Sequence, residues 1–354
     1  MKIGILTFHA AHNYGAILQC YALQKYLSAH GHAVEVINYQ NEKLMSVYKP
    51  LSFNRFLRKN PISFVKLLSA ELKYYQLRKE RCNKFSYFLD NYIPLSHTDM
   101  LFKDYYDLIL VGSDQVWNYK LTYGFDKFYW GQFDHSGKIL ASYAASMHDN
   151  WPKEYNSTIE SYLQAFDYLS VRETSLLKKL QEIIPNKVIY QCVDPTLLLN
   201  AEDWKAFGKA PNITKRYVLV YQVDPNPIAI KIAEKVSTER KLEILYLSAR
   251  AEGMNSKDIR SSSPQEFVGL FKNAEFVISS SFHGTIFSLM FNKPFYSVRN
   301  KGKEERIISL LKPAGLIDRF VDKVPNEIDY SMYSNSFDDM IAQSKKFLDI
   351  ITFS

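Results

Sequence analysis

The sequence contains little cysteine and no long apolar run. Its 354 residues include only Cys20, Cys82 and Cys192, with no Cys-x-x-Cys pair. This excludes a disulfide framework and a cysteine-based zinc site of ordinary spacing. We expect each cysteine to be a small buried residue of a reduced, cytosolic protein. No stretch approaches the roughly 18 consecutive apolar residues that suggest a membrane-spanning helix, so none is predicted.

Common ligand-binding motifs are also absent. The sequence has no Walker A motif, no Gly-x-Gly-x-x-Gly and no Gly-x-Ser-x-Gly. A nucleoside triphosphate site, a dinucleotide site of the usual kind and a nucleophile elbow are therefore not predicted. His9, His12 and His148 lack the spacing of metal ligands, so we predict neither a metal nor a resident cofactor.

Acidic residues are scarce in one basic segment of the chain. The formal net charge is +7, yet residues 43–84 hold eleven Lys and Arg against only Glu71 and Glu80. Leu and Phe alternate with these charges, which is typical of basic amphipathic helices. We expect a helical insertion at about 43–92 that either packs on the protein or contacts an anionic membrane surface through 43–84. Nucleic acid is not an expected partner, because no recognition motif accompanies the charge.

Strand and helix patterns alternate along the chain. Strands are predicted at 2–8, 33–39, 106–111, 138–144, 168–171, 187–192, 217–222, 242–248, 275–279 and 294–298, mostly with helices between them. This alternation predicts an α/β protein with parallel sheets covered by helices on both faces. We place one domain at 1–200, a polar linker at 201–216 and a second domain at 217–354. The last predicted helix could cross back onto the first domain.

The most informative stretch runs from Glu275 to Met290, where a buried strand turns directly into a helix. Ser281, His283, Gly284 and Thr285 lie at the turn. A helix N-terminus attracts anions, glycine allows a ligand to approach the backbone, and histidine exchanges protons near neutral pH. Together these residues suit an enzyme that handles a phosphate or carboxylate. The alternative is a capped helix start with a structural histidine.

Polar residues also follow other predicted strands, where ligands bind in open parallel sheets. The further candidates are Asn13, Tyr14 and Gly15 at the first helix, Asp114, Trp117 and Asn118, then Arg172, and finally Arg299 and Lys301. Asp114 could act as a base on a sugar hydroxyl beside a Trp117 stacking platform, and Arg172 could bind a carboxylate in bidentate fashion. The structural alternatives are an Asn helix cap, an Asp turn cap, a surface ion pair at Arg172 and a solvated basic loop.

Five motifs resemble those of the polysaccharide pyruvyl transferase family, in the same order and over about residues 3–300. They are Asn13–Leu23 (NYGAILQCYAL), Gly112–Asn118 (GSDQVWN), Ser170–Glu173 (SVRE), Asp194–Leu198 (DPTLL) and Ser281–Thr285 (SFHGT). The resemblance implies two Rossmann-like domains facing a central cleft, a GT-B-like arrangement with the acceptor on the N-terminal side and the donor on the C-terminal side. It also implies transfer of a pyruvyl group from phosphoenolpyruvate onto two sugar hydroxyls, which forms a cyclic ketal and releases phosphate.

The resemblance also suggests roles for the candidate residues. The expected donor site consists of Arg172, Ser281, Gly284, Thr285, Arg299 and Lys301, and the expected acceptor site of Asn13, Tyr14, Gly15, Trp117 and Asn118. His283 is the expected acid and Asp114 the expected base. The acceptor is a sugar of a surface or capsular polysaccharide precursor, which could be carried on a lipid diphosphate at the inner membrane face. This placement would make the protein cytoplasmic and peripheral to the membrane.

Two other functions fit the same scaffold, because fold does not settle function. One is a glycosyltransferase that uses a sugar nucleotide, which needs a carboxylate to bind the ribose. The only candidates for that carboxylate in the second domain are Glu252, Asp258 and Glu266. The other is a non-catalytic glycan-binding protein, which would show no turnover of a donor.

Overall fold

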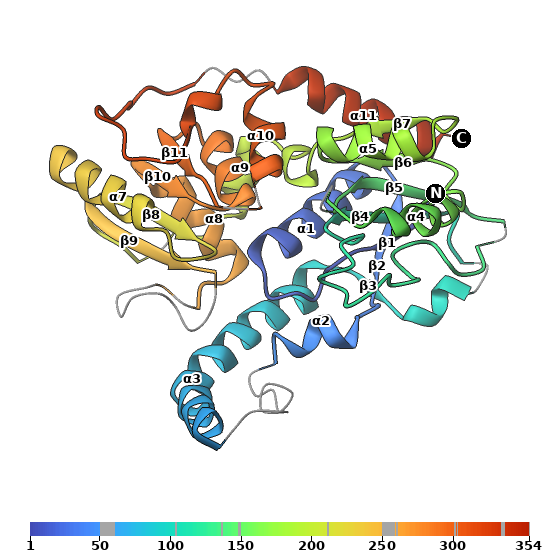
Figure 1. Cartoon of the computed structure of the whole chain (residues 1–354), viewed down its shortest axis with the longest axis horizontal. Helices are drawn as coiled ribbons and strands as arrows, with labels where there is room; N and C mark the ends of the chain where they lie inside the picture. Colours follow the sequence, from blue (N-terminus) through green and yellow to red (C-terminus); the bar gives the residue numbers. More distant parts are fainter. Residues whose placement is uncertain are drawn as a thin grey trace.

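Two parallel sheets, each covered by helices, form the fold (Figure 1). The computed structural model describes residues 1–49, 61–102, 105–135, 137–147, 150–210, 212–249, 259, 261–300, 302, 304–333 and 337–353, without the side chains of 61–71 and 102. The expected α/β class with two parallel sheets is confirmed.

The first sheet has seven strands in the order β3-β2-β1-β4-β5-β6-β7. They are β1 (Lys2–Leu6), β2 (Ala33–Ile37), β3 (Leu95–Ser96), β4 (Leu108–Asp114), β5 (Ile139–Ala145), β6 (Leu169–Val171) and β7 (Ile189–Gln191). Every residue of β4 is buried, as expected for a parallel strand with helices on both faces. Because β4, β5 and β6 run parallel, the polar residues after them emerge at one edge of the sheet.

The second sheet has five strands in the order β12-β11-β10-β8-β9. They are β8 (Tyr217–Gln222), β9 (Glu243–Ser248), β10 (Phe276–Ser279), β11 (Phe295–Val298) and β12 (Phe320–Val321). The helices of this half are α7 (Pro227–Arg240), α8 (Pro264–Asn273), α9 (Phe282–Met290) and α10 (Glu304–Leu311). A capping box between Ser263 and Glu266 fixes the start of α8.

Helices and short 3₁₀ turns cover the first sheet and join it to the second. They are α1 (Tyr14–Ala29), α2 (Glu42–Ser46), α3 (Pro61–Tyr92), α4 (Asn156–Leu163), α5 (Thr174–Ile183) and α6 (Ala201–Phe207), with 3₁₀ turns at Thr98–Phe102, Lys153–Tyr155 and Pro195–Leu197. A further 3₁₀ turn, Ile317–Arg319, precedes β12 in the second half. The segment 201–216, which we expected to be a linker, therefore contains the helix α6. Asn200 and Asp203 form a second capping box there, a signal that the polar composition of the segment obscured.

Helix α1 lies between the two halves of the molecule. Thirteen of its 16 residues are buried, and it packs on the 3₁₀ turn at Pro195–Leu197 and on α8. The ring of Tyr14 stacks on Phe267 of α8 with 4.4 Å between ring centroids. A helix that is apolar all round needs cover on every side, and here both halves supply it. One hydrophobic core consequently runs from the first sheet into the second.

Helix α11 (Asp338–Thr352) returns from the second half to the first and ends beside the N-terminus (Figure 1). The Ser344 hydroxyl accepts a hydrogen bond of 2.9 Å from the backbone N–H of Val193. The Phe347 ring lies 4.9 Å from that of Tyr190 in β7. The chain thus crosses between the halves twice, which ties them together near the C-terminus.

The basic helical insertion consists of α2 and α3, on either side of residues that lie outside the described structure. Arg81 of α3 is buried, with its guanidinium 4.5 Å from the Tyr14 ring centroid. It donates hydrogen bonds to the Tyr14 hydroxyl and to the carbonyl oxygens of His12 and Ala249 at 3.0–3.1 Å. Lys84 pairs with Glu266 of α8 at 3.0 Å. These two cations of the basic segment therefore join the halves.

No helix in the described parts of the chain combines the length and apolar character needed to cross a membrane.

We predict that Arg81→Met lowers the free energy of unfolding by about 2–3 kcal/mol, because buried backbone oxygens lose a charged donor. Urea unfolding followed by fluorescence measures the change. Lys79→Met, an exposed position on the same helix, is the matched control and should leave the urea midpoint unchanged. Equal midpoints for the two variants would show that Arg81 does not stabilise the contact between the halves.

Candidate active site

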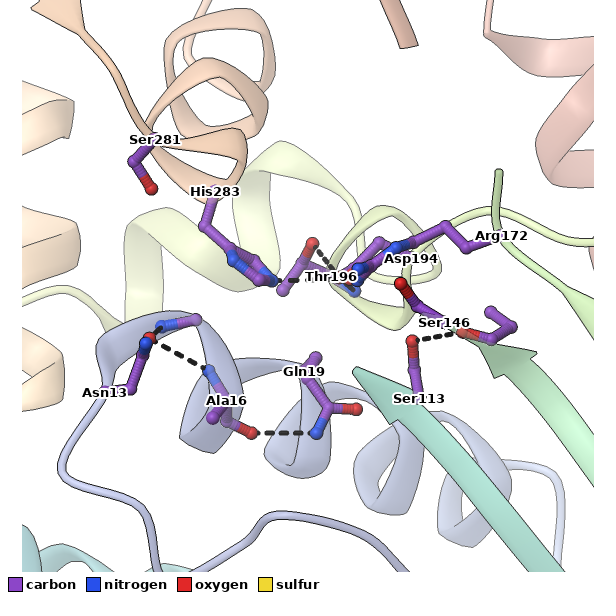
Figure 2. Close-up of polar contacts among 12 residues, drawn as sticks. Asn13, Ala16, Gln19, Ser113, Ser146, Arg172, Asp194, Thr196, Ser281 and His283 are labelled. Atoms are coloured by element: carbon purple, nitrogen blue, oxygen red, sulfur yellow. Dashed lines mark hydrogen bonds and ion pairs between the residues drawn. The ribbon is translucent and has the colours of Figure 1, made fainter. Parts of the chain in front are cut away.

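His283 projects from the start of α9 toward α1 and toward the turn after β7 (Figure 2). Its side chain is only 7% exposed. The imidazole Nε2 lies 3.3 Å from Asp194 Oδ2, an ion-pair distance without the alignment of a hydrogen bond. His283 belongs to the second half of the molecule and Asp194 to the first, so this contact spans the two.

Asp194 is fully buried, and each of its two carboxylate oxygens accepts hydrogen bonds from nearby residues. Its Oδ1 accepts hydrogen bonds from the backbone N–H and the hydroxyl of Thr196, at 3.1 and 2.7 Å. Its Oδ2 accepts one from Arg172 Nη1 at 2.7 Å. Burial alone would raise the pKa of Asp194, but the charges of His283 and Arg172 and these hydrogen bonds hold that pKa well below its usual range. Asp194 is therefore a permanent carboxylate beside the histidine.

Arg172 follows β6 and connects Asp194 to a second carboxylate. Its Nε lies 3.0 Å from Glu173 Oε1, which also accepts a hydrogen bond of 2.8 Å from the Ser146 hydroxyl. Burial opposes the charge on Arg172, but Glu173, Asp194 and Asp114 raise its pKa. The ion pair of Arg172 with Glu173, which was the alternative for this residue, is therefore present but is buried and not at the surface, and the network links the ends of β5, β6 and β7.

Gly15 makes room for the histidine at the N-terminus of α1. A Cβ atom added at Gly15 would lie 2.0 Å from His283 Nδ1, far inside van der Waals contact. The helix start is capped by Asn13, whose Oδ1 accepts hydrogen bonds from the N–H groups of Gly15 and Ala16 (Figure 2). Gly15 and Asn13 therefore lie beside His283, and the only role that the described contacts give Asn13 is that of a helix cap.

Asp114, the last residue of β4, is oriented by an uncommon backbone conformation. Its φ of 69° is in the left-handed region, which Asp tolerates better than most residues. The side chain is 9% exposed, and no hydrogen bond or ion pair joins it to a residue in the described ranges. Its charge acts on both Arg172 and Arg306, so the carboxylate lies near the same polar cluster. Such a residue can accept a proton.

A pocket of about 450 Å³ opens between the halves next to this network. Its lining includes Gln115, Ser146 and Glu173 from the first half and Glu304, Glu305 and Arg306 from α10. The volume is within the usual range of about 300–1,000 Å³ for small-molecule sites. Neither His283 nor Asp114 lines this pocket directly. Glu173 and Arg306 also line a smaller cavity with Arg172, Asp194 and Phe282, so this cavity lies beside the pocket.

The structure corrects the aromatic part of the expected acceptor site. Trp117 is fully buried, stacked on Trp130, and its indole N–H donates to the Tyr129 carbonyl oxygen, so it cannot stack on a sugar. Tyr14 is equally buried against α8. Asn118 is 2% exposed and donates to the side chain of Gln115. All three support the loops rather than face a ligand.

At the N-terminus of α9, where we expected a phosphate to bind, the polar groups are already engaged by the protein's own residues. The Ser281 side chain caps the N–H of Gly284. The Thr285 hydroxyl lies 2.6 Å from that of Ser297 and is fully buried. A Cβ at Gly284 would lie 2.1 Å from Ser279 Oγ, so this glycine serves close packing. These contacts support the structural alternative for the cap residues, while His283 keeps its place in the polar network.

The basic loop after β11 does not join the described network. Arg299 is half exposed and lies 3.8 Å from Asp322, with its guanidinium over the Phe320 ring. Lys301 and His148 lie outside the described residues. His9 is buried and contacts the Thr7 carbonyl and Asn38. Within the described ranges, no group of three His, Cys, Asp or Glu side chains is arranged to hold a metal ion.

Two residues of the site received no role from the sequence. Asp194 is in one of the five motifs, but its tie to His283 depends on contact between residues 89 positions apart. Arg306 lies shortly after the basic loop that includes Lys301, in the first turn of α10. The sequence signal that could have identified Arg306 was its position after the end of a strand, but the more numerous charges of the loop obscured it.

Solved structures of other proteins are similar to this chain over nearly all of its length. The UDP-GlcNAc 2-epimerase of Methanocaldococcus jannaschii matches with a TM-score of 0.50 and 14% identity over 100% of both chains. The UDP-N-acetylglucosamine 2-epimerase of Rickettsia bellii gives 0.49 and 13%, over 99% of this chain and 95% of that one. The Streptomyces glycosyltransferase SsfS6 gives 0.39 and 14%, over 100% and 96%. At these identities the likeness concerns the fold, which is GT-B-like.

No curated protein matches the sequence significantly. A family profile described as polysaccharide pyruvyl transferase matches residues 13–302, which is most of the chain. The matched range contains His283, Asp194, Arg172 and Gly15, the residues that the structure brings together. The protein therefore belongs to the polysaccharide pyruvyl transferase family.

Proposed function

We propose that the protein transfers the pyruvyl group of phosphoenolpyruvate onto two hydroxyls of a sugar in a polysaccharide precursor. The observation that supports this most directly is the buried contact between His283 and Asp194, which places a proton-exchanging group where the two halves meet. The adjoining pocket offers hydroxyl, amide, carboxylate and guanidinium groups, which suit a sugar and an anionic donor. Family membership supports the same reaction.

The reaction balances with two proton transfers. Protonation of C3 of phosphoenolpyruvate makes C2 electrophilic, and a sugar hydroxyl adds to C2 as it loses its proton. Loss of phosphate then allows the second hydroxyl to add to C2 and close the ketal. One of the two hydroxyl protons ends on C3, and the other ends on the departing phosphate. The enzyme needs a group that gives a proton and a group that receives one.

We assign the donating role to His283 and the receiving role to Asp114. Asp194 holds a negative charge beside the imidazole and helps to fix the orientation of the ring. Asp114 carries a carboxylate that no described residue engages, so it is available to a hydroxyl. Arg172 joins the two carboxylates Asp194 and Glu173 into one rigid unit.

A sugar-nucleotide glycosyltransferase receives less support from the second half. Of the three carboxylates that we considered for a ribose, Glu266 caps α8 and pairs with Lys84. Glu252 and Asp258 lie outside the described residues. The architecture alone does not favour this reaction, because one fold accommodates many chemistries.

We further propose that the acceptor sugar is carried on a lipid diphosphate and that the basic segment contacts the membrane beside it. Lys43, Lys49, Lys73 and Lys79 are exposed. Each basic residue near an anionic surface contributes about 1 kcal/mol. Arg81 and Lys84 do not take part, because they contact the second half.

His283→Ala should lower turnover by about 10²–10⁴-fold, the usual contribution of one positioned acid or base. The assay measures phosphate release from phosphoenolpyruvate with lipid-linked and aryl glycosides, and mass spectrometry checks the acceptor for the gain of pyruvic acid less water. His97→Ala, an exposed histidine in the first half, is the matched control and should keep full activity. Unchanged turnover in a folded His283→Ala protein would remove this histidine from the mechanism.

Asp194→Asn should lower kcat by about 10²-fold with little change in KM, because Asp194 acts through the histidine and cannot contribute more than it. The decisive measurement is the double variant His283→Ala, Asp194→Asn. It should be about as slow as His283→Ala alone, since the second change then removes a group with nothing left to position. Fully multiplicative losses would mean that Asp194 works independently of His283.

Gly15→Ala should lower kcat by at least about tenfold, because the new methyl group displaces the imidazole from Asp194 and a small misplacement is costly. Steady-state kinetics on the same acceptor measure the loss. Lys25→Ala, at an exposed position of the same helix, is the control for a substitution in α1 away from His283 and should keep full turnover. Normal turnover in Gly15→Ala would show that the position of His283 in this structure is not the active one.

A further inference from the structure

Arg172 has little capacity left for a substrate. Its Nε and Nη1 atoms are engaged by Glu173 and Asp194, and one face of its guanidinium lies over the Phe282 ring at 4.6 Å. Only Nη2 is without a partner. A bidentate grip on a donor anion needs two free N–H groups on one edge of the guanidinium. Two carboxylates already neutralise this cation, so Arg172 attracts a further anion weakly.

The guanidinium of Arg306, in contrast to that of Arg172, is not engaged by the described residues. It lies in the first turn of α10, partly buried, and lines both the 450 Å³ pocket and the smaller cavity beside it. No hydrogen bond or ion pair joins its guanidinium to any residue within the described ranges. An arginine keeps its charge under all ordinary conditions, so this is a cation at the pocket wall whose donors are free.

The charges around Arg306 favour the binding of an anion to its guanidinium. Burial, followed by the positive charge of Arg172, lowers the pKa of Arg306, while Glu173, Asp114 and Asp194 act in the other direction. Glu173 and Asp194 are paired with Arg172, which lies between them. A second guanidinium close to the first is therefore unfavourable until a ligand brings negative charge.

The rest of the pocket restricts where that negative charge can lie. Gln115, Ser146, Asn150 and Ser175 offer neutral hydrogen-bonding groups, whereas Glu304 and Glu305 repel anions. Lys120 is the other lysine or arginine in the described lining, and it is exposed at the rim. An anionic group that enters between the halves is thus favoured at Arg306, and sugar hydroxyls suit the remaining surface.

We propose that Arg306 binds the anionic group of the donor substrate in this pocket, and that Arg172 is a positioning residue that holds Asp194 and Glu173. The inference rests on the proposed function in taking the donor to be an anion such as phosphoenolpyruvate. A planar carboxylate and a tetrahedral phosphate can each present two oxygens to a guanidinium, so the experiment separates them.

Binding of phosphoenolpyruvate, inorganic phosphate and pyruvate to the wild type, Arg306→Gln and Arg306→Lys is measured by isothermal titration calorimetry. Loss of a charged hydrogen-bond donor should weaken phosphoenolpyruvate by about 10- to 100-fold in Arg306→Gln and by less in Arg306→Lys. A parallel loss for phosphate alone assigns Arg306 to the phosphate, and a loss for pyruvate alone assigns it to the carboxylate. The melting temperature without ligand should not fall, because the side chain has no hydrogen-bond partner among the described residues to lose.

Arg240→Gln is the matched control, since Arg240 is an exposed arginine of the same half, at the end of α7. It should bind phosphoenolpyruvate as the wild type does. Equal affinity of the wild type and Arg306→Gln would overturn the role of Arg306 and leave the proposed reaction standing. If the wild type instead binds UDP-glucose but not phosphoenolpyruvate, and Arg306→Gln weakens it, the donor proposal fails and the anion site holds. Binding of neither ligand overturns both.

Discussion

The rest of the site depends on one buried carboxylate. Asp194 has no exposed surface on its side chain, and a charge in such a place is costly unless it is paired and hydrogen-bonded. Arg172, Thr196 and His283 meet that requirement from three directions. Because Arg172 is also bound to Glu173, displacing Arg172 would leave two buried carboxylates without their cation. This linkage holds the cluster in place, which suits the proposed proton transfer.

That carboxylate is useful only because the two halves of the molecule are in contact. Asp194 follows the last strand of the first sheet, and His283 follows a strand of the second sheet. The apolar surfaces of α1 and α8, with Tyr14 stacked on Phe267, close the space between the sheets. Arg81 satisfies backbone oxygens on both sides of the same junction. A large apolar contact of this kind limits relative movement of two domains.

Burial decided which candidate residues could meet a ligand. Asp114, Arg172 and His283 were selected because they follow strands, and the structure places them in one polar cluster. Trp117 was selected by the same rule, but its ring is sequestered against Trp130. Sequence patterns show where a strand ends and not which side chain turns inward, since that choice depends on residues from other elements. Free donors, as at Arg306, are visible only once every partner is known.

The sequence by itself determined the alternation of strands and helices, the two parallel sheets and the turns that carry the polar residues. Those features follow from local hydrophobic patterns and capping residues, which act over a few positions. Only the tertiary structure decided that the missing side chain of Gly15 leaves room for His283 and that Asp194 lies beside the imidazole. It also decided that Arg172 is paired with carboxylates while Arg306 has no partner among the described residues. Those relations join residues far apart in the chain, and their energies depend on burial and charge pairing that exist only after the halves have packed together.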